Sequence, residues 1–125
     1  MNKKQKSQLL YLLLAILWGG LIFYLSSIPD LSSGLAAWQD LILRKIAHVT
    51  VFLILTYLLV SSLDSNERHY LLFVIVIAIT YAFIDELHQT EVLHRSGNAR
   101  DVLIDSLGVI LGIIFYKYRI NKKIS

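Results

Sequence analysis

The sequence contains no cysteine, and long stretches of it contain no charged residue. Without cysteine the chain has no disulfide framework, no thiolate metal site and no cysteine nucleophile. Charged residues make up 17% of the 125 residues, while 56% are hydrophobic. A chain of this length is sufficient for one small domain, residues 1–125, and its composition is too apolar for an ordinary soluble one. We therefore expect a membrane protein.

Four apolar segments are free of charged residues: 7–29, 46–63, 70–84 and 106–116. A membrane-spanning helix needs roughly 20 residues, so the last two reach that length only if neighbouring charged residues lie within the helices. The first segment exceeds the roughly 7–15 apolar residues of a signal peptide, which favours a retained helix. The sequence thus predicts an all-α polytopic membrane protein with four transmembrane helices, over about 7–28, 45–63, 70–90 and 100–118.

The placement of the basic residues predicts the orientation of these helices. Seven basic residues flank the first and last helices: Lys3, Lys4, Lys6, Lys117, Arg119, Lys122 and Lys123. The positive-inside rule places this side, and therefore both termini, in the cytoplasm. Four cations fall on the outer side against this bias: Arg44, Lys45, Arg95 and Arg100. The positive-inside rule does not explain these four cations, which indicates another role for them.

The outer ends of the predicted helices carry most of the remaining polar residues. Because successive helices alternate in direction, the starts of the second and fourth and the end of the third lie in one layer. This layer contains ten candidate site residues: Lys45, His48, Asp85, Glu86, His88, Gln89, Arg95, Arg100, Asp101 and Asp105. Ionisable residues inside a membrane are costly and often mark functional sites. Gly108 and Gly112 lie on the same face of the predicted fourth helix as Asp101 and Asp105. They form a G-x-x-x-G pair that allows close helix approach.

These pieces resemble the VanZ-like family of small bacterial membrane proteins. The matching motifs, in the order and spacing of the family, are "SSIP" (26–29), "RKIAH" (44–48), "DELHQ" (85–89) and "RSGNARDVLIDSLGVILG" (95–112). The resemblance implies a multi-pass protein of the bacterial plasma membrane with a role in the cell envelope or in the response to teicoplanin-type glycopeptide antibiotics. The polar positions of the family carry over onto Lys45, His48, Asp85, Glu86, Gln89, Arg95, Asp101 and Asp105.

Three classes of function fit this layer of charges. In the favoured hypothesis it binds an anionic envelope lipid or cell-wall precursor, with Lys45, Arg95 and Arg100 on phosphate or carboxylate and the acids orienting them. An intramembrane enzyme acting on a lipid-linked substrate would use Asp85 and Glu86 as general bases, with His48 or His88 as proton carrier. A proton-coupled transporter or scramblase is less favoured, since four helices leave little room for alternating access and no internal repeat is evident.

The same charges could instead form a structural ion-pair network that locks the helices together. A metal site built from His48, His88, Asp85 and Asp105 is disfavoured, because "DELHQ" is not H-E-x-x-H and no two histidines are spaced i, i+4. No metal or other cofactor and no nucleic-acid partner is expected. The lipid bilayer is the expected environment, and the oligomeric state and the presence of an enzymatic activity are left open.

Overall fold

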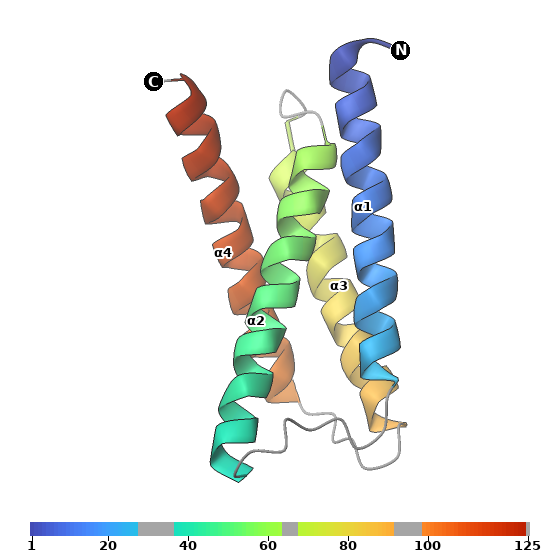
Figure 1. The fold of residues 1–125 in the computed structure, drawn as a ribbon, viewed down its shortest axis with the longest axis vertical. Helices are drawn as coiled ribbons and strands as arrows, with labels where there is room; N and C mark the ends of the chain where they lie inside the picture. The colour runs from blue at the N-terminus through green and yellow to red at the C-terminus, as the bar shows by residue number, and fades with distance from the viewer. Residues whose placement is uncertain (28–36, 64–67, 92–98, 125) are drawn as a thin grey trace.

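The computed structural model is a bundle of four helices that run alternately up and down (Figure 1). The helices are α1 (Lys3–Ser26), α2 (Ala37–Ser62), α3 (Tyr70–Thr90) and α4 (Ala99–Ile124). The structure describes residues 1–27, 37–63, 68–91 and 99–124, and within these ranges every regular element is a helix. The start of α1 and the end of α4 lie at the same end of the bundle (Figure 1). The predicted all-α class is confirmed.

Three helices extend beyond the bounds that their apolar segments indicated. α1 begins at Lys3 rather than near residue 7, because Asn2 and Gln5 form a capping box. The Asn2 side chain accepts a hydrogen bond from the backbone N–H of Gln5 at 2.8 Å. The Gln5 side chain accepts one from the backbone N–H of Asn2 at 3.0 Å. α2 begins at Ala37 rather than near 45, and α4 continues to Ile124 rather than ending near 118. A helix satisfies its backbone groups internally, so it need not end where the apolar segment ends.

Three of the four helices are long and apolar enough to cross a membrane: Lys3–Ser26, Ile42–Ser62 and Tyr70–His88. Large apolar side chains such as Leu17, Phe73 and Leu103 are exposed on the outside of the bundle, as lipid-facing residues are. The prediction of four spans is therefore confirmed for three helices. α4 runs beside the others along the bundle (Figure 1), but acids in its first turns and bases in its last turns lower its hydropathy.

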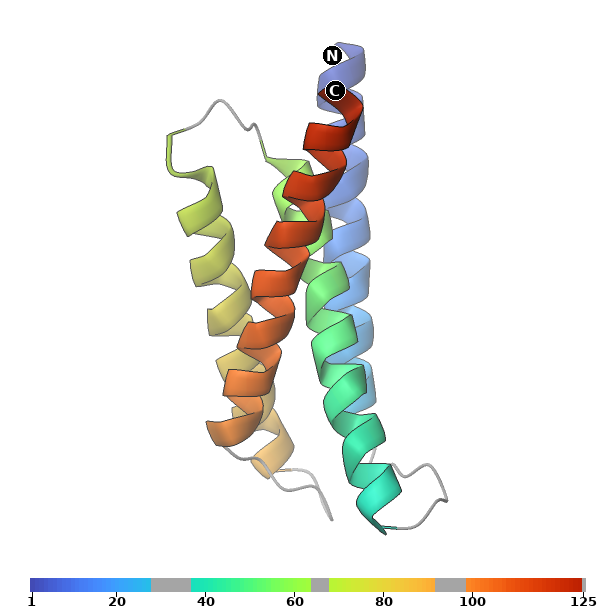
Figure 2. The same ribbon diagram turned by 90° about the vertical axis from the view of Figure 1, so that its left-hand side faces the viewer.

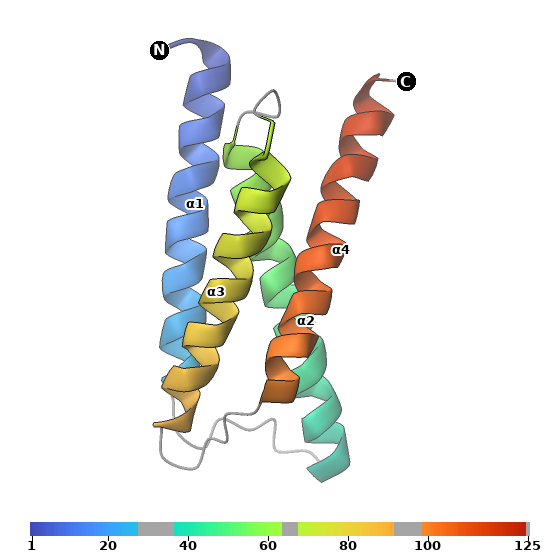
Figure 3. The same cartoon turned by 180° about the vertical axis from the view of Figure 1, so that it is seen from behind.

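The four helices are arranged around a central pair. α2 and α3 lie between α1 and α4, which are on opposite sides and do not contact each other within the described residues (Figures 1 and 3). The longest interface is between α2 and α4, which lie side by side in the middle of the bundle and diverge at the end away from the termini (Figure 2). The buried apolar core draws on all four helices and consists of Ile22, Phe52, Leu55, Ala78, Ala82 and Val109.

Side-chain hydrogen bonds attach the middle of α1 to the central pair. The Trp18 indole N–H donates to the carbonyl oxygen of Val51 in α2 at 2.9 Å, and the Tyr81 hydroxyl of α3 donates to the carbonyl oxygen of Gly19. Between membrane helices, where hydrocarbon offers a polar group no water, such a bond contributes about 0.6 kcal/mol on average. These bonds hold α1 in the bundle, since α1 does not contact α4 within the described residues.

Candidate functional site

The predicted site residues that the structure describes lie at one end of the bundle, which we call the polar end. It is formed by the last turns of α1 and α3 and the first turns of α2 and α4, opposite the termini (Figure 1). His48 of α2, Asp85 and Glu86 of α3, and Asp105 of α4 come together there from three helices. The last three are almost fully buried, at 1%, 5% and 0% exposure. We refer to these four residues as the polar cluster.

A hydrogen bond joins His48 to Asp105 and links α2 to α4. The Nδ1 atom of His48 lies 2.7 Å from Oδ1 of Asp105, a short distance typical of a charge-assisted bond. With Nδ1–H donating to the carboxylate, Nε2 is the ring nitrogen that remains for proton exchange. The second oxygen of Asp105, Oδ2, is buried and has no hydrogen-bond partner among the described residues. The pair therefore combines an oriented imidazole with a carboxylate oxygen that has spare capacity to accept.

The other two acids of the polar cluster act on this pair through their charges. Glu86 lies close enough to His48 to interact with it electrostatically. Asp85 similarly interacts with Asp105 and with the Tyr81 hydroxyl, which belongs to the same helix as Asp85. Carboxylates of like charge repel each other, and burial in a medium of low dielectric constant strengthens the repulsion. Such an arrangement favours a bound cation, a shared proton or a hydrogen-bond donor from a ligand.

Asp101 and Lys45 lie at the edge of the polar cluster. Asp101, half-buried in the first turn of α4, is near enough to interact electrostatically with both His48 and Asp105. Lys45 is exposed, as is its neighbour Arg44. Carboxylates in the first turn of a helix are favoured by the helix dipole, which stabilises Asp101 where it is. The cations of α2 are thus positioned towards the surface and the acids towards the interior.

His88 contacts α1 rather than the polar cluster. Its ring stacks on Phe23, with centroids 4.1 Å apart, and its Nε2 lies 2.7 Å from the Ser27 hydroxyl oxygen. That hydroxyl also donates to the Phe23 carbonyl oxygen at 2.8 Å. A hydroxyl has one proton, so His88 Nε2–H is the donor to Ser27 when both bonds are made. His88 therefore fastens the end of α3 to the end of α1.

This separation of the histidines excludes two kinds of centre within the described residues. The serine hydroxyl is bonded to His88 and the aspartate to His48, so Ser27, a histidine and Asp105 do not form one catalytic triad. The four ligands considered for a metal are not assembled either, since no group of three or more suitable side chains occurs in the described part of the chain. Asp85 lies near Asp105, to which His48 is bonded, whereas His88 is bonded to Ser27 instead.

Two glycines of α4 determine how closely it approaches His48 on α2. A β-carbon at Gly108 would collide with the Val49 carbonyl oxygen, and one at Gly112 would lie 2.7 Å from the Leu53 carbonyl oxygen. Only glycine permits these approaches of one backbone to another. Gly108 is one turn from Asp105, and Val49 is adjacent to His48. The glycine pair therefore sets the helix separation at which His48 and Asp105 can form their bond.

Some predicted site residues lie beyond what the structure describes. Arg95 is outside the described residues, and so are the side chains of Gln89 and Arg100. Sequence reasoning overlooked Ser27 as a partner of His88, although "SSIP" had been noted as a motif. Nothing in the spacing of Ser27 and His88, which are 61 residues apart, indicates their contact. The only feature of the sequence that pointed to this contact was the pair of serines near the end of the first apolar segment.

The chain was compared with known proteins. A family model described as VanZ/LLP1 matches residues 9–121, which is nearly the whole chain. No curated protein and no solved structure gives a significant match. The matched range includes the whole of α2 and α3, most of α1 and α4, and every residue of the polar cluster.

Proposed function

The chain belongs to the VanZ/LLP1 family, and from that premise we propose that it binds an anionic envelope ligand at the outer face of the bacterial plasma membrane. The ligand is an envelope lipid or a cell-wall precursor, and the role is in the cell envelope or the response to teicoplanin-type glycopeptide antibiotics. In this proposal α4 is the fourth membrane span. The polar end faces outward, because eight of the twelve basic residues belong to the opposite, cytoplasmic side.

The observation that supports a binding site is the burial of three carboxyl groups beside His48. A bundle of this size has apolar and small residues with which to pack α2, α3 and α4, and buried charges add little to stability when apolar replacements exist. A polar group at that depth is costly, and it is characteristic of sites that bind or transfer something polar. The polar cluster meets this description with Asp85, Glu86 and Asp105 all nearly inaccessible.

The cations provide the part of the site that attracts an anion. Arg44 and Lys45 are exposed at the polar end, and Arg95 and Arg100 belong to the adjoining stretch of sequence. A guanidinium fork grips a phosphate or carboxylate through two bonds. In the proposed arrangement these cations meet the anionic group, while the buried acids accept hydrogen bonds from hydroxyl or amine groups of the same ligand.

The proposal is tested with Arg95, where charge and geometry can be separated. The Arg95→Lys substitution keeps the charge but loses the fork, so we expect it to weaken binding of a polyprenyl phosphate almost as much as Arg95→Ala. Binding is measured on the purified protein in nanodiscs, and teicoplanin susceptibility is measured in cells that express each variant. Lys117→Ala, which removes an exposed cation at the other end, is the matched control. Full retention of binding and phenotype in Arg95→Ala would contradict the proposal.

A second candidate is an intramembrane enzyme, favoured by the 2.7 Å bond between His48 and Asp105. A carboxylate that orients an imidazole is a common arrangement for moving a proton. The enzyme hypothesis expects His48→Gln to abolish turnover of a lipid-linked substrate while leaving its binding intact. The binding hypothesis expects no turnover by the wild type and a loss of affinity in the variant. Mass spectrometry of lipid extracts after incubation separates the two outcomes.

A further inference from the structure

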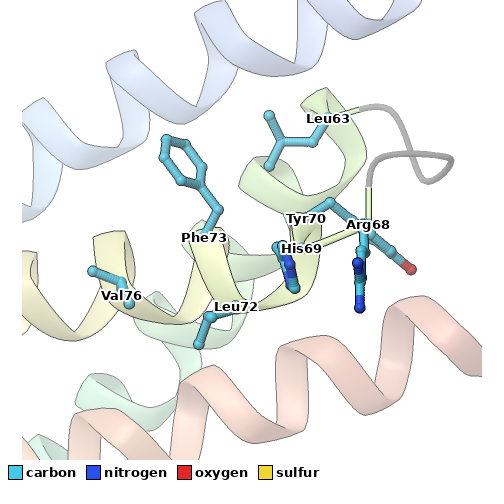
Figure 4. Close-up of a pocket in the computed structure, with 7 residues that line it drawn as sticks. All are labelled: Leu63, Arg68, His69, Tyr70, Leu72, Phe73 and Val76. Carbon is cyan, nitrogen blue, oxygen red and sulfur yellow. The ribbon is translucent and has the colours of Figure 1, made fainter.

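A cavity lies at the opposite end of the bundle, where α2 turns into α3 (Figure 4). Its volume is about 500 Å³, within the range of roughly 300–1,000 Å³ typical of ligand sites. The residues that line it are Leu63, Arg68, His69, Tyr70, Leu72, Phe73 and Val76. None of them belongs to the polar end, so the cavity has no part in the proposed function.

The lining of this cavity is divided into a basic end and an apolar length. Arg68 and His69 lie together at the start of α3, and Val76 lies furthest from them along the helix (Figure 4). From Tyr70 to Val76 a helix rises by about 9 Å, roughly 1.7 turns. Leu72 and Phe73, on this apolar length, are large and exposed. The cavity is therefore basic at one end and apolar along the rest of its length, which matches a lipid with a charged headgroup and a hydrocarbon chain.

We propose that this cavity binds an anionic glycerophospholipid of the leaflet in contact with the termini. The phosphate is held by the Arg68 guanidinium and the His69 ring, and an acyl chain lies along Leu72, Phe73 and Val76. With the orientation argued above, this is the cytoplasmic leaflet, where anionic lipids are concentrated.

Charge complementarity supports this occupant. Arg68 and His69 are exposed, and both line the cavity. A guanidinium can donate two parallel bonds to a phosphate. A basic pocket at the cytoplasmic ends of membrane helices is a recurring site for anionic headgroups.

The apolar length distinguishes a lipid from a soluble anion. A free phosphate compound would occupy only the basic end and would leave Phe73 and Val76 without a partner. An acyl chain covers them and gains apolar contact along the whole length. The gain is smaller when the chain comes from the bilayer, so the headgroup contacts determine which lipid binds.

The test titrates the purified, delipidated full chain with phosphatidylglycerol or phosphatidylcholine of identical acyl chains, and counts bound lipid by native mass spectrometry. The wild type is expected to prefer phosphatidylglycerol. One Arg near an anionic surface contributes about 1 kcal/mol, so Arg68→Gln is expected to weaken phosphatidylglycerol binding about fivefold and to leave phosphatidylcholine unchanged. His69→Gln is a second variant in the same direction.

The matched control is Lys117→Gln, which removes an exposed cation of α4 that does not line the cavity. The proposal holds if this variant keeps wild-type preference and Val76→Trp, which fills the apolar length, weakens phosphatidylglycerol binding. Equal affinity for the two lipids overturns the proposal, and so does an equal effect of Lys117→Gln and Arg68→Gln. Competition by glycerol 3-phosphate as strong as that by phosphatidylglycerol overturns the lipid assignment in favour of a soluble anion.

Discussion

At the scale of single residues, the main feature is the difference between the two histidines of the polar end. His48 holds a buried carboxylate through Nδ1, whereas His88 is stacked on an aromatic ring and bonded to a hydroxyl. The first arrangement polarises an imidazole beside acids, and the second fastens two helices. We therefore propose His48 as the proton carrier in any chemistry of this site, with His88 in a supporting role.

The acids of α3 allow function to be separated from folding. Asp85→Asn and Glu86→Gln keep the size of the side chains and remove the cost of a buried charge. We expect the thermal unfolding midpoint of both variants in detergent to stay near that of the wild type, while ligand binding and any envelope phenotype are lost.

Phe52→Ala is the matched control for a change that does affect folding. Phe52 is fully buried in the apolar core, so its truncation is expected to cost about 3–5 kcal/mol of stability. If the two acid variants unfold as readily as Phe52→Ala does, the polar cluster is a structural ion-pair network and the binding proposal is wrong.

At the scale of helices, the interface between α2 and α4 controls the site. Gly108 and Gly112 bring the α4 backbone against that of α2 along the turns that follow Asp105. Close backbone approach places Asp105 within hydrogen-bonding distance of His48, which a wider separation would not permit. Gly108 and Gly112 therefore contribute to the site without contacting a ligand.

Substitution of these glycines tests that role. Gly108→Ala and Gly112→Ala are each expected to lower the free energy of unfolding by about 1–3 kcal/mol, because the added methyl group meets backbone atoms that cannot move aside cheaply. Gly20→Ala is the control, since a β-carbon there meets nothing within 4 Å. It should be neutral or slightly stabilising, because alanine favours a helix. Denaturation in mixed detergent micelles measures all three, and equal stability of the three variants would refute the close packing.

At the scale of the whole molecule, two unlike ends define the orientation. The end with the termini carries the lysines of both chain ends together with Arg68 and the lipid cavity. The other end carries the polar cluster, Asp101, His88 and the exposed Arg44 and Lys45. This asymmetry is what the positive-inside rule acts on, and it places the two proposed sites on opposite faces of the membrane.

Cysteine labelling tests the orientation directly, because the chain has no cysteine of its own. Glu91→Cys, exposed at the polar end, should react with an impermeant maleimide on intact cells. Asn121→Cys, exposed near the end of α4, should react only after the cells are opened. The reverse pattern would move the polar end to the cytoplasm and the lipid cavity to the outer leaflet.

The sequence alone was sufficient for the helices and for the layer that holds the polar residues. Both depend on local properties: the length of an apolar stretch, the position of lysines beside it, and the alternating direction of successive helices. The motifs around His48, Asp85 and Asp105 also indicated the family before any geometry was known. Local patterns were less reliable for helix ends, because the cap at Asn2 and the polar turns at the start of α2 continue the helices into water.

The tertiary structure alone decided which polar residues are partners. His48 and His88 were equal candidates in the sequence, since both lie in the same layer and near acids. Their different partners depend on the rotation of each helix and on its distance from its neighbour, which arise from packing between segments far apart in the chain. The bond of His48 to Asp105 spans 57 residues and that of His88 to Ser27 spans 61. No local pattern encodes such contacts, because they exist only once the helices have packed together. For His48 and Asp105, that packing requires Gly108 and Gly112 to admit α4 against α2.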